Sequence, residues 1–324
     1  AADIRVAGGA FDIDAADDAV HSNGSIAITG GEFAIASGDD GIHADAALEI
    51  AGGTIDIADS YEGIEGAEIA VSNGSVRIVA SDDGVNVAGG NDESATGGRR
   101  GPDAFAASAG GKLTISGGYL YVDAQGDGLD ANGSIAMSGG TAIVNGPTDN
   151  GNGALDYDGT FELTGGLLIA AGSAGMAQGP SEQSTQAGIL MTYPQTQAAG
   201  TLVRLEDGDG NAIVTFAPAK SYQSVFVSTP DLRQGAAYTL YTGGASTGAA
   251  TDGLYADGTY EGGTKVVAFE TASVVTWVNE SGVTEAGSGR PGGFGGGGKP
   301  GMEGPGQGGQ GGGRMRPDGG GQPQ

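Results

Sequence analysis

A short motif recurs along the first half of the chain: an acidic residue, then glycine or alanine, an aliphatic residue and a polar residue. Its copies are Asp18-Ala19-Val20-His21, Asp40-Gly41-Ile42-His43, Glu62-Gly63-Ile64-Glu65, Asp83-Gly84-Val85-Asn86 and Asp127-Gly128-Leu129-Asp130. The first four acids lie 22, 22 and 21 residues apart, and the fifth follows after 44. A fixed period of this length is typical of structural units that stack on one another.

Two alternating apolar runs follow each copy of the motif, with a pair of small residues between them. In the second unit, Leu48-Glu49-Ile50 precedes Gly52-Gly53, and Ile55-Asp56-Ile57 comes after. Alternation with period two indicates strands, and glycine tolerates the backbone angles of a sharp corner. Each unit of about 21–22 residues therefore predicts three short strands that pair in parallel with the next turn, at about 4.8 Å per turn. The sequence predicts an all-β fold with a parallel β-helix over residues 1–174.

The repeat departs from its pattern in two places. Residues 89–111 lengthen one turn, which predicts a loop beside the acidic positions. At the start, Ile4, Val6, Phe11 and Ile13 match only the second half of a unit. We therefore expect residues upstream of Ala1 to be missing from this sequence, which would leave an open strand edge.

Beyond Gly175 the period is lost, and residues 175–284 are expected to form an antiparallel β-rich region that caps or extends the helix. The expected strands are 189–191, 202–205, 213–216, 224–227, 238–241 and 265–269. The stretch from Asp207 to Asn211 resembles the start of an EF-hand loop, but Pro218 occupies the position of the bidentate glutamate, so a hairpin turn is predicted. Residues 285–324 are rich in glycine and proline and predict a flexible tail.

The amino-acid composition excludes several classes of binding partner. The formal net charge is −27, from 13 Lys and Arg against 40 Asp and Glu, which argues against nucleic acid as a partner. No apolar run approaches the roughly 18 residues of a membrane span, so no membrane insertion is expected. There is no cysteine, which excludes disulfides and thiolate metal sites. A secreted protein without its signal peptide would have this composition, and we expect an extracellular or cell-surface location.

Stacking places the repeated acids in one column, where carboxylates about 5 Å apart repel by roughly 1 kcal/mol in water. Calcium takes about 6–8 oxygen ligands at about 2.3–2.6 Å, so ligands on opposite sides of one ion are separated by about the spacing of the turns. We therefore predict several Ca²⁺ ions, with ligands drawn from Asp17, Asp18, Asp39, Asp40, Glu62, Glu65, Asp82, Asp83, Asp127, Asp130 and Asp156. The alternative for any single acid is a solvent-facing corner residue that accepts hydrogen bonds from backbone amides. His21 and His43 are expected to face solvent rather than bind a transition metal.

Several segments carry a resemblance to a known family. Residues 81–92, 126–134, 220–228, 254–260 and 273–276 resemble the bacterial secreted "carbohydrate-binding domain-containing" β-helix family, over about residues 3–282. The resemblance implies an extracellular, calcium-containing, pectate-lyase-like right-handed β-helix. It also implies binding of plant cell-wall polysaccharides, cellulose and acidic sugars among them, without established catalysis. The tail lies outside the resemblance.

The residues themselves support the same function. Calcium on an acidic face can bridge to the carboxylates of an acidic polysaccharide. The residues expected to contact sugar are Tyr61, Arg77, Asn91, Asp92, Tyr119 and Tyr121. We therefore predict a non-catalytic, calcium-dependent protein that binds plant cell-wall polysaccharide, either pectin-like or cellulosic.

Two other classes stay open. A calcium-dependent polysaccharide lyase would need a base near the metal. Candidates are Arg77, Lys112 and Arg99-Arg100, but no two basic residues occupy adjacent turns beside the acids, which argues against a lyase. The other class is a structural or adhesive surface protein that self-associates through its N-terminal coil or its Gly-rich tail.

Overall fold

The computed structural model of the chain describes residues 2–88 and 110–286. All of them belong to one compact unit. The described residues form strands and no helix, and hence no helix that could cross a membrane. The prediction of an all-β fold is confirmed.

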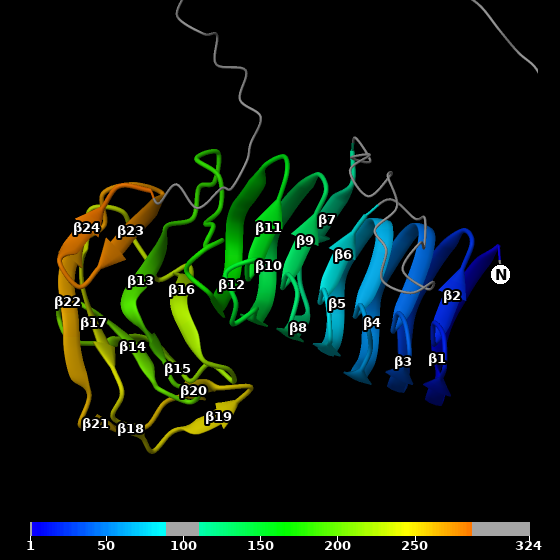
Figure 1. Ribbon diagram of the computed structural model, residues 1–324, viewed down its shortest axis with the longest axis horizontal. Helices are drawn as coiled ribbons and strands as arrows, with labels where there is room; N and C mark the ends of the chain where they lie inside the picture. Colours follow the sequence, from blue (N-terminus) through cyan, green and yellow to red (C-terminus); the bar gives the residue numbers. More distant parts are fainter. Residues whose placement is uncertain (1, 89–109, 287–324) are drawn as a thin grey trace, which may run out of the picture. The chain divides into compact units, whose positions relative to one another are not determined.

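Strands β1 to β12 form a solenoid of about seven turns, stacked in parallel (Figure 1). The turns are, in order, β1 (Asp3–Ala15); β2 (Val20–Ser22) with β3 (Ser25–Ser37); β4 (Ile42–Asp59); β5 (Ile64–Ala80); β6 (Val85–Val87) with β7 (Lys112–Ile115) and β8 (Tyr119–Ala124); β9 (Leu129–Ala131) with β10 (Ser134–Asn145); and β11 (Leu155–Tyr157) with β12 (Phe161–Gly172). In β4 and β5 a single strand runs through all three expected segments, with register shifts at the corners. The predicted parallel β-helix is confirmed.

Like residues stack through the core of the solenoid. One column, each member paired in register with the next, consists of Ile28, Ile50, Val71, Ile115, Met137 and Leu163. All six are at most 1% exposed. Fully burying an aliphatic side chain of this size stabilises a fold by about 1.5–3 kcal/mol, so columns of this kind hold the turns together.

The corners need glycine for two separate reasons. Gly74 has a φ of +90°, which side chains rarely adopt. A Cβ at Gly52 would lie 2.6 Å from the carbonyl oxygen of Thr29 in the turn below. Close approach thus disfavours a side chain at the first corner position and the positive φ disfavours one at the second, which explains why glycine is frequent at the corners, although Asn73 precedes Gly74 in the third unit.

The turn that contains residues 89–109 keeps its pairing. β5 pairs with β7 and β8, and β6 pairs with β9, so Asp83 and Asp127 belong to adjacent turns despite their separation of 44 residues. The extra length falls between Val87 and Lys112, as predicted. The loop expected at 89–111 lies mostly outside the described residues.

Four C-terminal strands extend the solenoid sheet in the order β12-β16-β13-β23-β24. They are β13 (Gly188–Gln197), β16 (Tyr222–Ser228), β23 (Val275–Asn279) and β24 (Gly282–Thr284). The β12–β16 and β16–β13 pairs are antiparallel, so the direction of stacking ends at β12. The antiparallel pairing expected for this region is confirmed for β16, β13 and β24, whereas β23 pairs in parallel with β13.

A second sheet has the order β19-β20-β15-β14-β17-β22, and β18 pairs with β21. Its strands are β14 (Val203–Asp207), β15 (Ala212–Phe216), β17 (Ala237–Thr242), β19 (Ala249–Thr251), β20 (Leu254–Ala256) and β22 (Thr264–Glu270); the short pair is β18 (Ala245–Ser246) and β21 (Tyr260–Glu261). Asp207 accepts hydrogen bonds from the amides of Asp209 and Asn211 at 3.0 and 2.8 Å. The predicted hairpin turn between β14 and β15 is confirmed.

The strands β13 and β16 separate two hydrophobic cores. Leu190 and Phe226 belong to the core of the solenoid, whereas Ile189 and Val225 belong to the second core. Because side chains alternate along a strand, each strand contributes to both. The division of the chain at residues 174 and 284 stays a prediction, and most of the expected tail lies outside the described residues.

Candidate functional site

Two columns of polar side chains run along one edge of the solenoid. We call the first the acid column, and it consists of Asp18, Asp40, Glu62, Asp83 and Asp127. The second, the partner column, lies three residues further along each turn and consists of His21, His43, Glu65, Asn86, Asp130 and Asp156, paired in register. The period therefore aligns the polar residue of every motif as well as its acid.

Hydrogen bonds from backbone amides partly explain why acidic residues recur in the acid column. Oδ1 of Asp18 accepts the amide of Asp40 at 3.1 Å, and Oδ1 of Asp83 accepts the amide of Asp127 at 2.6 Å. Asp127 accepts the amide of Gly153 in the last turn. Each of these acids thus satisfies a corner amide of the following turn, which is one reason for an acid at this position.

The middle of the columns is a buried ionic cluster around His43. The Nδ1 atom of His43 lies 2.9 Å from Asp40 and 3.1 Å from Glu65, and all three residues are shielded from solvent. Burial opposes the charged imidazole, but the hydrogen bonds to Asp40 and Glu65 prevail and raise the pKa of His43 to about 11. The expectation that His43 faces solvent is wrong, because the two carboxylates and the neighbouring turns enclose it.

Carboxylates outnumber the cation in this cluster. Burial raises the pKa of Asp40 to about 8, although its hydrogen bond with His43 acts in the opposite direction. Burial and the charge of Glu65 raise the pKa of Glu62 well above its ordinary value. Asn86 donates a hydrogen bond to Glu62 at 2.7 Å. One imidazolium cannot balance three ionised acids, so the raised pKa values keep protons on Asp40 and Glu62 near neutral pH.

His21 stacks on His43, with ring centroids 4.8 Å apart and 5° between the planes. Nδ1 of His21 lies 2.5 Å from Asp18, and Nε2 of His43 lies 3.2 Å from Asp45. The side chain of His21 is 35% exposed. The two histidines thus occupy equivalent register positions in different surroundings.

The far end of the columns contains only oxygen ligands. Asp83, Asp127 and Asp130 place carboxylate oxygens within 4.8 Å of one another. Burial, followed by the charges of Asp83 and Asp127, raises the pKa of Asp130 to about 9. The group is half-buried, so a cation could reach it and replace the proton that the crowding favours.

Only some of the remaining predicted ligands belong to a group that could hold a metal ion. Asp17, Asp18 and Asp39 form another group with oxygens within 4.8 Å. Asp82 instead hydrogen-bonds Tyr61, and Asp156 accepts a hydrogen bond from Gln178 at 2.6 Å. Among the described residues, the groups that could hold a metal do not include Glu62, Asp82 or Asp156. The metal-binding role of all these acids stays a prediction.

The predicted sugar contacts lie in two places. Tyr61 is 39% exposed and lies beside the acid column. Arg77 forms an ion pair with Asp252 and stacks on the ring of Tyr121, 4.4 Å from its centroid. Tyr119 donates a hydrogen bond to Asp252 at 2.6 Å.

Asp252, a turn residue outside the repeat, thus binds Arg77 and Tyr119, and Arg77 in turn covers the ring of Tyr121. Asn91 and Asp92 lie outside the described residues, as do Arg99 and Arg100. Lys112 is exposed on β7.

A comparison with known proteins finds one family. A family model described as "Carbohydrate-binding domain-containing protein" matches residues 1–41, which include β1 to β3 and the first acids of the column. The resemblance seen in the sequence is confirmed over this stretch. No curated protein and no solved structure matches the chain.

Proposed function

We propose that the protein is a non-catalytic, calcium-dependent carbohydrate-binding protein that binds polysaccharide outside the cell or at its surface. The observation that carries the proposal is the group of Asp83, Asp127 and Asp130 on the solenoid of a chain whose first 41 residues match a carbohydrate-binding family model. The match supports sugar binding, and the carboxylate group supports a cation.

Calcium suits the far end of the columns better than a transition metal does. The ligands there are carboxylate oxygens alone, and hard cations prefer oxygen. Two oxygens up to 4.8 Å apart fit on one ion whose bonds are about 2.3–2.6 Å long. The half-buried position leaves room for ligands from water or from a bound sugar.

A cation at this edge would also explain how a chain of net charge −27 binds acidic sugars. A bound Ca²⁺ accepts ligands from the protein and from a uronate at the same time. Tyr61, exposed beside Asp82, offers an aromatic face along the same edge. We place the polysaccharide along this edge, with pectin-like chains as the first candidates.

The cation is tested by thermal unfolding with calcium and with chelator. We expect Ca²⁺ to raise the Tm by several degrees, and Asp130→Asn and Asp127→Asn to remove that shift, because binding to the folded state stabilises it. Glu49→Gln, an exposed acid on β4 outside the columns, should keep the full shift. A Tm that does not respond to chelator would refute the calcium site.

Sugar binding is tested by co-sedimentation with insoluble pectin and with cellulose. We expect the protein to sediment with the polymer, and chelator to release it from pectin. The supernatant should not gain the ultraviolet absorbance of an unsaturated uronate. Appearance of that product would assign a lyase activity instead, and failure to sediment with any polysaccharide would refute carbohydrate binding.

A further inference from the structure

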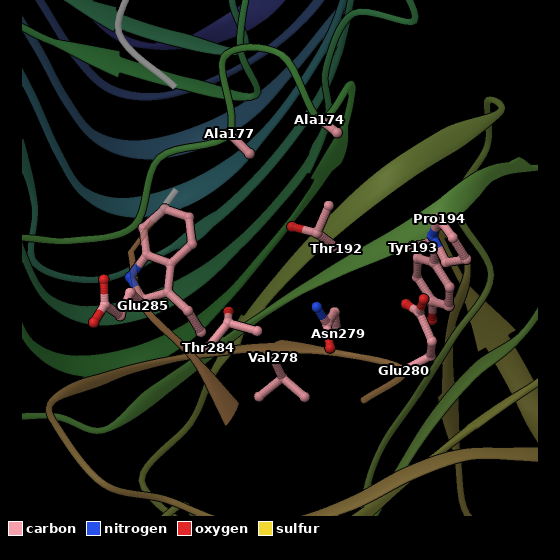
Figure 2. A pocket seen from close by; sticks show the side chains of 11 residues that line it. Ala174, Ala177, Thr192, Tyr193, Pro194, Val278, Asn279, Glu280, Thr284 and Glu285 are labelled. Atoms are coloured by element: carbon pink, nitrogen blue, oxygen red, sulfur yellow. The ribbon is translucent and has the colours of Figure 1, made fainter. Parts of the chain in front are cut away.

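A cavity of about 490 Å³ lies where the C-terminal strands extend the sheet of the solenoid. Its walls come from the segment after β12, from β13, and from the β23–β24 hairpin. Figure 2 shows Ala174 and Ala177 on one side, facing Thr192 and Asn279. Ligand sites commonly measure about 300–1,000 Å³, so this cavity has the size of a binding site. We call it the Trp277 pocket.

Trp277 is the only tryptophan in the chain, and it lines this pocket. It is half-buried on β23, where it pairs with Leu190 of β13 and Thr284 of β24. Part of the indole packs against the solenoid core, which fixes the ring in place. Ala174 and Ala177, whose side chains end at Cβ, leave space in the opposite wall. A rigid aromatic surface with open space beside it suits the flat C–H face of a sugar ring.

Polar groups surround this aromatic surface. Asn279 uses its Oδ1 to accept the amide of Ser281 at 2.8 Å, which leaves its NH₂ group as a donor. Thr192 adds a hydroxyl group. In Figure 2, Glu280 lies at one end of the pocket near Tyr193 and Pro194, and Glu285 lies at the other end with Thr284. These groups can donate to and accept from several hydroxyls at once.

The charge of the pocket selects among sugars. Glu280 and Glu285 are exposed, and within the described residues neither forms an ion pair. Two carboxylates accept hydrogen bonds from hydroxyl groups but repel a uronate. The pocket therefore favours an uncharged sugar, in contrast to the cation-bearing edge of the solenoid.

We propose that the Trp277 pocket binds a neutral sugar unit of a polysaccharide, with the ring against the indole and its hydroxyls donating to Glu280 and Glu285. The inference rests on the proposed carbohydrate binding and assigns a second, calcium-independent subsite to it. A protein with both sites contacts acidic chains along the columns and neutral chains at the C-terminal strands.

The single tryptophan gives a direct test on the full chain. Cellohexaose, xylohexaose and mannohexaose are titrated separately while Trp277 emission is followed, in the presence of chelator, with hexagalacturonate as the anionic comparison. We expect at least one neutral oligosaccharide to change the emission in a saturable way and hexagalacturonate to leave it unchanged.

Variants then locate the binding by calorimetry. Trp277→Ala should weaken it by about tenfold or more, because the change removes the aromatic surface on which the sugar ring packs. Because Trp277 also packs on the core, Ala174→Phe provides a second variant that fills the pocket and keeps the indole. Ala212→Phe, at an exposed position on β15, is the matched control and should bind normally. Glu280→Gln with Glu285→Gln should allow hexagalacturonate to bind.

Three outcomes would overturn the inference. They are unchanged emission with every neutral sugar, binding that survives Ala174→Phe, and a stronger response to hexagalacturonate than to the neutral sugars. If the protein still sediments with polysaccharide, the proposed function stands and only the pocket fails. If it sediments with none, the proposed function fails by itself.

Discussion

In the solenoid, each residue lies above its equivalent in the turn before, whereas in the C-terminal strands unlike residues meet. Parallel in-register pairing stacks Ile50 on Val71 and, by the same rule, His43 on Glu65. Antiparallel pairing sets Leu190 against Phe226, and no two acids are paired in register in the C-terminal strands that the structure describes. The solenoid therefore aligns charged side chains in columns. The Trp277 pocket of the C-terminal region is instead lined by residues that have no equivalents in a repeat. A repeat therefore multiplies both favourable and unfavourable contacts.

The largest effect is expected where the columns depend on a single cation. His43→Gln leaves Asp40 and Glu65 buried without an imidazolium, and removing one partner of a buried ion pair costs about 3–5 kcal/mol. His21→Gln, at the equivalent position one turn earlier but 35% exposed, should cost under about 1 kcal/mol. Chemical denaturation of both variants measures the two values. Equal losses would show that charge in the column is not compensated locally.

The next effect tests stacking of the backbone itself. Gly52→Ala places a Cβ 2.6 Å from the carbonyl oxygen of Thr29, which we expect to cost about 1–3 kcal/mol. Gly8→Ala occupies the same corner position in the first turn, where a Cβ would meet nothing within 4 Å, and should stay within about 0.5 kcal/mol of the parent. The pair is compared by thermal unfolding. A neutral Gly52→Ala would mean that the turns can separate at little cost.

The pH dependence of stability distinguishes the two polar columns from the rest of the protein. The folded-state pKa values of Asp40, about 8, and Asp130, about 9, exceed the ordinary value of 3.8. These protonated carboxyls therefore contribute stability fully below pH 3.8, and lose it as the pH rises through about 8 and 9. His43 acts in the same direction between pH 6.5 and about 11.

In chelator, the Tm should thus fall by several degrees between about pH 5 and pH 9, and calcium should oppose that fall because it replaces the protons. Asp130→Asn should flatten the slope, and Glu49→Gln should leave it unchanged. A Tm that rises over this range in chelator would contradict the assignment of the raised pKa values to the columns.

The smallest effect concerns the connection between the two regions. Asp252, at a positive φ of 51°, joins Arg77 and Tyr119 of the solenoid. Asp252→Asn keeps a residue that tolerates this backbone angle but removes the charge, and we expect a loss of about 1 kcal/mol or less. Faster amide hydrogen exchange in residues 249–256 of the Asp252→Asn variant would reveal this small loss of stability. Asp257→Asn, at φ 53° in the neighbouring turn, should change neither quantity; the same exchange in both variants would remove Asp252 from this role.

Most of the solenoid could be predicted from the sequence, because the period of a translational repeat is enough to predict which strands pair. The inward aliphatics, the glycine corners and the adjacency of Asp83 and Asp127 all followed from it. The burial of His43 did not follow, since it depends on neighbouring turns whose side chains differ from one to the next. The period did contain a signal, because it places Glu65 in the column of the histidines.

The C-terminal region was harder to predict. Most of its strands showed in the alternation of apolar residues, but their partners did not, because antiparallel pairing across long separations leaves no period. Arg77 and Tyr119 were expected to face a sugar, and the residue they contact, Asp252, is 175 and 133 positions away. The Trp277 pocket depends on three segments that meet only in the fold. A lone tryptophan in a chain with 6% aromatic residues was the available sign.

The uninterrupted ladder around residues 89–109 has a consequence for how such a chain can change its length. The described residues on either side of that stretch nearly meet, since a Cβ at Gly111 would lie 3.0 Å from Cγ1 of Val87. Closing a longer segment between ends this near costs only about 0.6 kcal/mol for each doubling of its length. Evolution, or a protein engineer, can therefore insert foreign sequence here, and the turns on either side will keep their partners.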